Sequence, residues 1–224
     1  MKTNTQTSLK RGFTLVELLV VIAIIAVIAG FSTPAIMGGL KRAQMTKSMN
    51  NATQMHKALF LYAMDYDGEF ISDDNAGLVD DSVSTLSKAS DAYGVLMKSG
   101  AISSSEESLF YTKELKVAVP THKKGNNDGN FTEQECGYSY VKNLANTSNA
   151  NAPLVTTKVK SASGEFYSEV WQHRAIIVRA GGAATITKLS GNVDDGDAQV
   201  REIDGGSAKN IFDIATEAGG ELCQ

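Results

Sequence analysis

An uncharged apolar run places the strongest constraint on how this chain of 224 residues can fold. From residue 18 to residue 31 no side chain is charged, and nearly every one is Val, Ile, Leu or Ala. With its flanks, over residues 13–38, the run predicts a helix of about 40 Å at about 1.5 Å per residue, long enough to span a bilayer. Glu17 lies near its start, and a carboxylate there costs about 2.5 kcal/mol or more unless it finds a partner.

Two simpler interpretations of this run are a secretory signal peptide and an ordinary membrane anchor. Residues 29–32 loosely fit a signal cleavage site, but the helical apolar pattern continues well beyond them. An anchor requires only length and hydrophobicity. Neither interpretation explains Glu17, or the junction of Gly12 and Phe13 directly behind Lys10 and Arg11.

The segment KRGFTLVELLVV at residues 10–21 resembles the class III leader junction of type IV pilins and type II secretion pseudopilins. The resemblance implies that residues 1–12 are a leader peptide, which a prepilin peptidase cleaves between Gly12 and Phe13 on the cytoplasmic side. The same enzyme would methylate the new amino group of Phe13. The other implied partners are further copies of the chain, minor pilins or pseudopilins, and an inner-membrane assembly platform.

The resemblance also implies a location. The chain would cross the bacterial inner membrane once, with the leader cytoplasmic and the head periplasmic or extracellular, and would enter a filament after assembly. Lys2, Lys10 and Arg11 agree with a cytoplasmic leader, although Lys41 and Arg42 just beyond the run mean that basic residues alone do not set the topology.

The residues at the junction suit this scheme physically. Gly12 has no side chain to block a protease. The charged amino group of Phe13, from the same chain or a neighbouring one, would neutralise Glu17, because a paired buried carboxylate is tolerated whereas an unpaired one is not. Pro34 removes one helical hydrogen bond, so we expect it to bend or locally melt the helix. Residues 13–39 are therefore predicted to be the membrane and assembly half of the helix.

Residues 40–67 are predicted to continue as an amphipathic half, because apolar residues recur there at three- and four-residue spacing. They are Met45, Met49, Ala52, Met55, Leu59 and Tyr62. His56, beside this stripe, is interpreted as a hydrogen-bonded surface or boundary residue. Gly68 marks the end of the helix.

The end of this helix carries a second resemblance. The sequence from Tyr62 through Asp65-Tyr66-Asp67-Gly68 is similar to a signature of pilin-like proteins from planctomycetes, verrucomicrobia and their relatives. Many of those proteins have an Asp-Gly-His hairpin near the C-terminus. In this chain Gly181-Gly182-Ala183 takes its place downstream of His173, so the Asp and His of that turn are missing.

Residues 68–224 are predicted to form one globular head. Strands are expected at 138–141, 154–159, 174–179 and 185–189, with the last two forming an antiparallel hairpin around Gly181 and Gly182. Short helices are expected at 92–98, at 106–115 and near 210–215, and a turn at 73–77. The predicted fold class is α+β and pilin-like, with a long N-terminal helix packed on a small antiparallel sheet.

Charge and cysteine content limit the partners of the head. Loss of Lys2, Lys10 and Arg11 with the leader takes the formal charge from −4 to −7, which argues against nucleic acid as the main partner. Cys136 and Cys223 are the two cysteines. In an oxidising compartment they would form one disulfide, and two free thiols are the alternative.

No catalytic pattern is present in the sequence, so we do not expect an enzyme. His56, His122 and His173 have no spacing typical of a zinc site or a nucleophile triad. A helix-ending turn explains Asp65 and Asp67.

No cofactor is predicted, although two segments are calcium candidates. The first candidate resembles a helix-loop-helix calcium loop and would use Asn126, Asp128 and Glu135, although Lys124 stands at its first position. The second would use Asp194, Asp195 and Asp197. For both segments the alternative is a solvated acidic loop.

These observations favour a structural filament subunit, either of a type II secretion pseudopilus or of a surface pilus. The alternative is a membrane-anchored binding module that exports its head and does not polymerise. Glu17 distinguishes them, because an anchor would work as well with Leu at that position.

Overall fold

The computed structural model describes residues 13–113, 124–125, 131–161, 163–167, 171, 173–190, 199–204 and 207–223, with the backbone alone between 201 and 209. The chain divides into two compact units, and the boundary lies between Arg42 and Ala43. One long helix, α1 (Leu15–Asp65), contributes its first part to the first unit and its second part to the head.

The second part of α1 carries the predicted apolar stripe. Met45, Ala52, Met55, Leu59 and Tyr62 are buried, and Met49 is partly buried against the core. Lys47, Asn50 and Lys57 lie off the stripe and are exposed. The period of 3.6 residues therefore predicted correctly which side of this segment the head covers.

The helix ends where the sequence predicts. Asp67 and Gly68 both have positive φ angles, of 50° and 85°, and the Gly68 N–H donates to the Ala63 carbonyl at 2.7 Å. This six-to-one hydrogen bond across a left-handed residue is the Schellman C-terminal motif.

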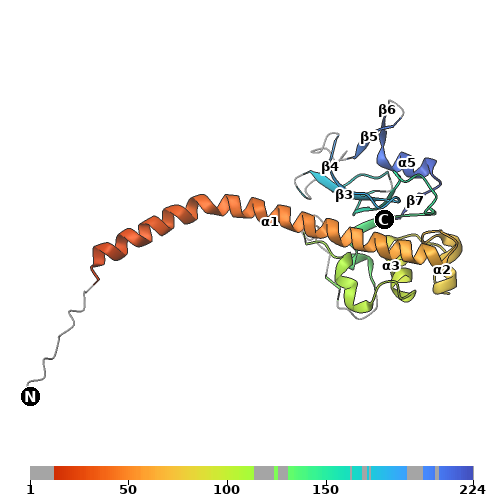
Figure 1. Ribbon diagram of the computed structural model, residues 1–224, viewed down its shortest axis with the longest axis horizontal. Coiled ribbons are helices and arrows are strands. Elements are labelled where there is room, and N and C mark those ends of the chain that lie inside the picture. The colour runs from red at the N-terminus through yellow and green to blue at the C-terminus, as the bar shows by residue number, and fades with distance from the viewer. Residues whose placement is uncertain are drawn as a thin grey trace, which may run out of the picture. The chain divides into compact units, whose positions relative to one another are not determined.

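An antiparallel sheet of five strands, in the order β4-β3-β2-β1-β7, forms the centre of the head (Figure 1). The strands are β1 (Tyr138–Lys142), β2 (Pro153–Thr157), β3 (Arg174–Arg179), β4 (Ala184–Lys188) and β7 (Glu221–Cys223). The predicted hairpin of β3 and β4 is confirmed, with Gly182 at φ 85° in its turn. The α+β class with a long helix on a small antiparallel sheet is likewise confirmed.

Helices and a small hairpin complete the head. The elements after α1 are α2 (Asp73–Val79), α3 (Ala89–Lys98), and the 3-10 helices η1 (Ser104–Phe110) and η2 (Glu133–Glu135). Near the C-terminus β5 (Arg201–Asp204) pairs with β6 (Ser207–Asn210), and α5 (Ile211–Glu217) follows. The sequence predicts α3 and α5 to within a few residues but none of β5, β6 and β7.

Residues 73–77 are helical, so the predicted turn is wrong. Ser72 caps α2, because its hydroxyl accepts the Asn75 N–H at 3.3 Å while the Asn75 side chain accepts the Ser72 N–H at 2.9 Å. The Tyr62 hydroxyl of α1 also donates to Asn75, at 3.0 Å. A tertiary contact thus stabilises a helix that the local Asp-Asn-Gly composition disfavours.

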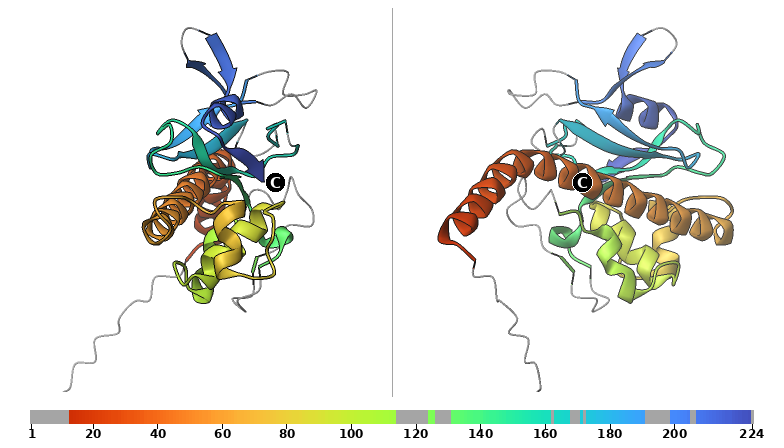
Figure 2. Two further views of the ribbon diagram at one scale, coloured as in Figure 1. Left: turned by 90° about the vertical axis from the view of Figure 1, so that its right-hand side faces the viewer. Right: turned by 60° about the vertical axis from the view of Figure 1, so that its left-hand side comes forward.

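The second part of α1 runs beside both the sheet and the α2–α3 segment (Figure 2). All five residues of β1 and of β2 are buried, which requires cover on both faces of the sheet. From α1, the Ser48 carbonyl accepts the hydroxyl of Tyr138 at 2.9 Å. Of the other helices, α5 packs on β2 and α3 on β1. The edge strand β4 is only half-buried.

Candidate functional site

The start of α1 is a capping box formed by Thr14 and Glu17. The Glu17 carboxylate oxygen Oε2 accepts the backbone N–H of Thr14 at 2.8 Å and the Thr14 hydroxyl at 2.7 Å. In return the Thr14 hydroxyl accepts the Glu17 N–H at 3.3 Å. Two backbone donors of the first turn are therefore satisfied, and the negative charge lies at the positive end of the helix dipole.

This capping box was readable from the sequence, because Thr-x-x-Glu before an apolar run is a local signal. The sequence-based interpretation assigned Glu17 to charge pairing alone. The structure adds a second role for the same carboxylate, within its own helix. Glu17 remains exposed there, so the cap leaves it accessible to another group.

The residues that follow form an exposed apolar surface. Leu15, Val16, Ile22, Ile25 and Phe31 have between 58% and 81% of their surface exposed, and other apolar side chains up to Leu40 are similarly open. The helix also contains a stretch that is apolar enough and long enough to cross a membrane. An apolar surface of this length is typical of a helix surrounded by lipid or by other apolar helices.

Pro34 lies inside this helical segment, and the helix is assigned continuously through it. The hydroxyls of Ser32 and Thr33, directly before Pro34, donate to the carbonyls of Ile28 and Ala29, one turn earlier, at 2.8 Å. Pro34 therefore does not melt the helix locally, whereas a bend at Pro34 stays a prediction. Of the predicted cleavage site, Gly12 and the leader lie outside the described residues, and Phe13 is exposed.

The calcium candidates mostly lie outside the described residues, which omit Asn126, Asp128, Asp194, Asp195 and Asp197. Glu135 is described, and its carboxylate accepts the N–H and the hydroxyl of Thr132 at the start of η2, at 2.9 and 2.6 Å. Within the described ranges no three carboxylate, cysteine or histidine side chains cluster closely enough to hold a metal. Calcium binding therefore stays a prediction.

Cys136 and Cys223 are separate buried thiols, so the disulfide alternative does not hold in this structure. In the ladder of β1 and β7, Cys223 is opposite Tyr140, four residues along the chain from Cys136. Four extended residues span about 13 Å, whereas a disulfide requires Cα atoms within about 7 Å. Burial raises the pKa of each thiol to about 12.

His56, His173 and the helix-end carboxylates lie in different environments. His56 is buried rather than at the surface, and its Nε2 donates to the Ala180 carbonyl at 2.9 Å. His173 is exposed, with a φ angle of 62° next to the first residue of β3. Asp65 and Asp67 are exposed at the end of α1. His122 lies outside the described residues.

Comparisons with known proteins support the significance of the N-terminal segment. A family model described as the prokaryotic N-terminal methylation motif matches residues 7–33. The type II secretion system core protein G of Escherichia coli K12 is 39% identical over 59 residues, which cover 26% of this chain and 41% of that protein. The type IV major fimbrial protein FimA of Dichelobacter nodosus is 36% identical over 58 residues, covering 26% and 37%.

A longer match extends into the head. The fimbrial protein EcpC of Eikenella corrodens is 28% identical over 154 residues, covering 69% of this chain and 93% of that protein. By contrast, the matches to the secretion protein and to FimA cover less than half of the length of those relatives. No solved structure matches the chain.

Proposed function

Because the chain belongs to the family of type IV pilins and type II secretion pseudopilins, we propose that it is a structural filament subunit and not an enzyme. Relatives of both kinds, secretion and fimbrial, support this class. The observation that carries the proposal is the capped carboxylate of Glu17 at the start of an exposed apolar helix.

In this proposal the precursor enters the bacterial inner membrane with residues 1–12 on the cytoplasmic side. A prepilin peptidase cleaves between Gly12 and Phe13 and methylates the new amino group of Phe13. An assembly platform then transfers the subunit from the membrane into a filament, among other copies and minor pilins or pseudopilins. The head is exposed on the outside of that filament.

The cap explains how one carboxylate can serve both the helix and the filament. The Thr14 N–H holds Glu17 at the first turn, beside the residue whose amino group cleavage would release. An ammonium group on Phe13, from the same copy or a neighbouring one, would neutralise the carboxylate there. Glu17 keeps its hydrogen bonds to Thr14 in either case, so pairing does not require the helix to fray.

Charge pairing also provides a specific attraction between subunits, which the apolar surface alone does not provide. Lipid tails are as apolar as Leu and Ile, so burial of the helix among other helices gains little over the membrane. An unpaired carboxylate is costly in lipid, whereas one beside an ammonium group is tolerated. We propose that Glu17 thereby sets the register of the subunit in the filament.

The test compares native-membrane protein and sheared filaments for wild type, Glu17→Gln and Thr14→Val. Gln keeps the capping geometry and removes the charge, while Val removes the capping hydroxyl and keeps the charge. We expect N-terminal sequencing and intact mass to show a chain beginning at methylated Phe13 in all three. We expect filaments from wild type and Thr14→Val, and none from Glu17→Gln.

Two results would contradict parts of this proposal. Filaments of normal abundance from Glu17→Gln would mean that the carboxylate acts as a helix cap alone. A membrane protein that still carries residues 1–12 and forms no filament would support the alternative, a non-polymerising anchored binding module.

A further inference from the structure

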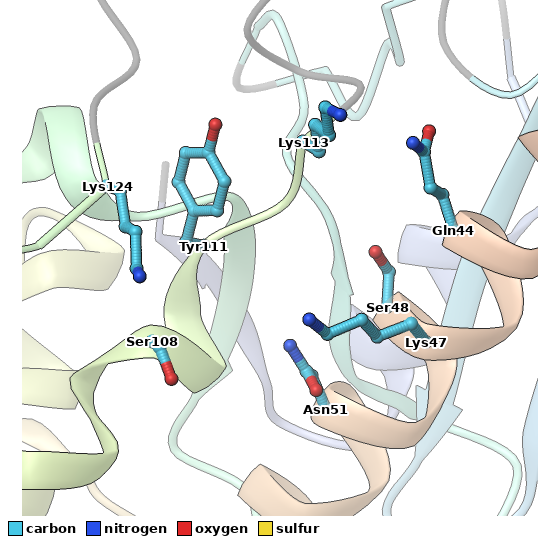
Figure 3. Close-up of a pocket in the computed structure, with 8 residues that line it drawn as sticks. All are labelled: Gln44, Lys47, Ser48, Asn51, Ser108, Tyr111, Lys113 and Lys124. Atoms are coloured by element: carbon cyan, nitrogen blue, oxygen red, sulfur yellow. The ribbon is translucent and has the colours of Figure 1, made fainter.

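A polar cavity of about 430 Å³ lies in the head between the second part of α1 and the segment around η1. Figure 3 shows its walls, with one group of side chains extending from α1 and the other from η1 and the residues that follow it. The lining residues are Gln44, Lys47, Ser48, Asn51, Ser108, Tyr111, Lys113 and Lys124.

Three lysines line this cavity, although the chain as a whole is acidic. Lys47, Lys113 and Lys124 are exposed, and within the described part of the chain none of them forms an ion pair. The same part of the chain pairs Lys88, Lys98, Lys142 and Lys158 with carboxylates. No Asp or Glu is among the lining residues; Glu107 of η1 is buried against Gly125 instead. The cavity is therefore a local concentration of positive charge.

Two polar side chains of low exposure, Asn51 and Ser48, also belong to the α1 wall. Asn51 is 8% exposed and Ser48 is 4% exposed, and both line the cavity. In Figure 3 the Asn51 amide and the Lys47 ammonium group extend from α1 toward the wall that carries Ser108 and Lys124. The α1 wall therefore presents neutral hydrogen-bonding groups beside the ammonium group of Lys47.

We propose that this cavity binds a phosphoryl group, through the ammonium groups of its lysines and the polar side chains of Asn51, Ser48 and Ser108. Donors from two walls suit a tetrahedral oxyanion, which can accept hydrogen bonds on several oxygens at once. The source is either a phospholipid headgroup or free phosphate. In the sequence Gln44 comes four residues after Leu40 at the end of the apolar run, so the proposed function makes phospholipid headgroups available as a source.

The proposal of a phosphoryl site depends on the cavity and not on the proposed function. Only the suggestion of a lipid source depends on the proposed function. The full chain in a neutral detergent would be titrated calorimetrically with inorganic phosphate and with a short-chain phosphatidylglycerol. A diacylglycerol of the same chain length, which lacks the phosphate, is the control ligand. Variants Lys47→Gln and Lys113→Gln alter exposed side chains of the cavity. Lys57→Gln removes the same charge from an exposed position of α1 outside it.

We expect saturable binding of at least one phosphate-bearing probe, weakened about tenfold by Lys47→Gln or Lys113→Gln and unchanged by Lys57→Gln. Binding of both probes identifies the phosphate as sufficient, and binding of the lipid alone identifies the headgroup as the source. Saturable binding of neither probe, equal binding of the diacylglycerol, or an equal effect of Lys57→Gln would overturn the proposal. Failure of filament assembly leaves the outcome of this titration unaffected, so the two proposals fail separately.

Discussion

The ammonium group of Lys142 lies 2.7 Å from the carboxylate oxygen Oδ2 of Asp73, at the start of α2. Lys142 is 5% exposed, and it also donates to the Leu86 carbonyl at 3.0 Å and lies 3.3 Å from Glu221 of β7. The other oxygen of Asp73 accepts the Leu86 N–H at 2.7 Å. One lysine of β1 therefore connects α2, the segment before α3 and the last strand.

We expect Lys142→Met to lower the free energy of unfolding by about 2–3 kcal/mol, because it leaves the Asp73 carboxylate and the Leu86 carbonyl without their cation. Lys98→Met is the matched control, since Lys98 pairs with Asp80 but keeps 53% of its side chain exposed. Lys98→Met should lower the free energy of unfolding by no more than about 1 kcal/mol. Urea unfolding followed by the fluorescence of the single tryptophan, the buried Trp171, measures both. Equal losses of stability in the two variants would mean that the burial of Lys142 does not strengthen its ion pair.

Acid should weaken the head through Asp80. Hydrogen bonds from Lys98 and then Ser82 lower the pKa of Asp80 to about 2. A carboxylate with a depressed pKa in the folded state stabilises above its unfolded value of about 3.9, and this stabilisation is lost as the pH falls toward 2. The pKa of Asp73 is also lowered, because its hydrogen bonds from Lys142 and Leu86 outweigh the opposing effect of burial.

The measurement for Asp80 is the free energy of unfolding of wild type and Asp80→Asn between pH 5 and pH 2. Wild type should lose more stability over this window than the variant, so that the two curves approach each other at low pH. Parallel curves would show that Asp80 has the same pKa in the folded and unfolded states.

Local patterns predicted much of this fold. The stripe from Met45 to Tyr62 depends only on helical periodicity, and the hairpin of β3 and β4 only on two apolar runs around Gly181 and Gly182. The structure confirms both, and β3 has the predicted bounds. The Thr14 and Glu17 capping box is equally local, but the carboxylate was interpreted through its charge alone.

The features that the sequence does not reveal depend on distant partners. Strand β7 has three residues and is defined by its pairing with β1, about 80 residues earlier. Lys142 would ordinarily be expected at the surface, and its burial requires Asp73 and Glu221 from two other elements. The phosphoryl cavity similarly combines α1 with residues around η1, so no spacing in the sequence indicates it.

The two cysteines should be unreactive in the folded head. Cys136 and Cys223 are each 1% exposed, and burial raises the pKa of both thiols to about 12, so little thiolate is present at neutral pH. We expect iodoacetamide at pH 8 to modify neither in the native protein and both after denaturation without a reductant. An intact mass that lacks two hydrogens, with alkylation only after reduction, would instead establish a disulfide.

The buried His56 should stabilise the contact between α1 and the β3–β4 hairpin. Its Nε2 must carry the hydrogen, because the Ala180 carbonyl at 2.9 Å can only accept, and its ring packs against Gly182 in the turn. We expect His56→Ala to lower the free energy of unfolding by about 1–3 kcal/mol, since it removes this donor and leaves a void. His56→Gln, which retains an N–H donor, should cost less, and Lys57→Ala on the exposed face should change stability by less than about 0.5 kcal/mol. Urea unfolding of the three variants tests this order of stabilities. If His56→Ala lowers the free energy of unfolding no more than Lys57→Ala does, this hydrogen bond does not stabilise the hairpin.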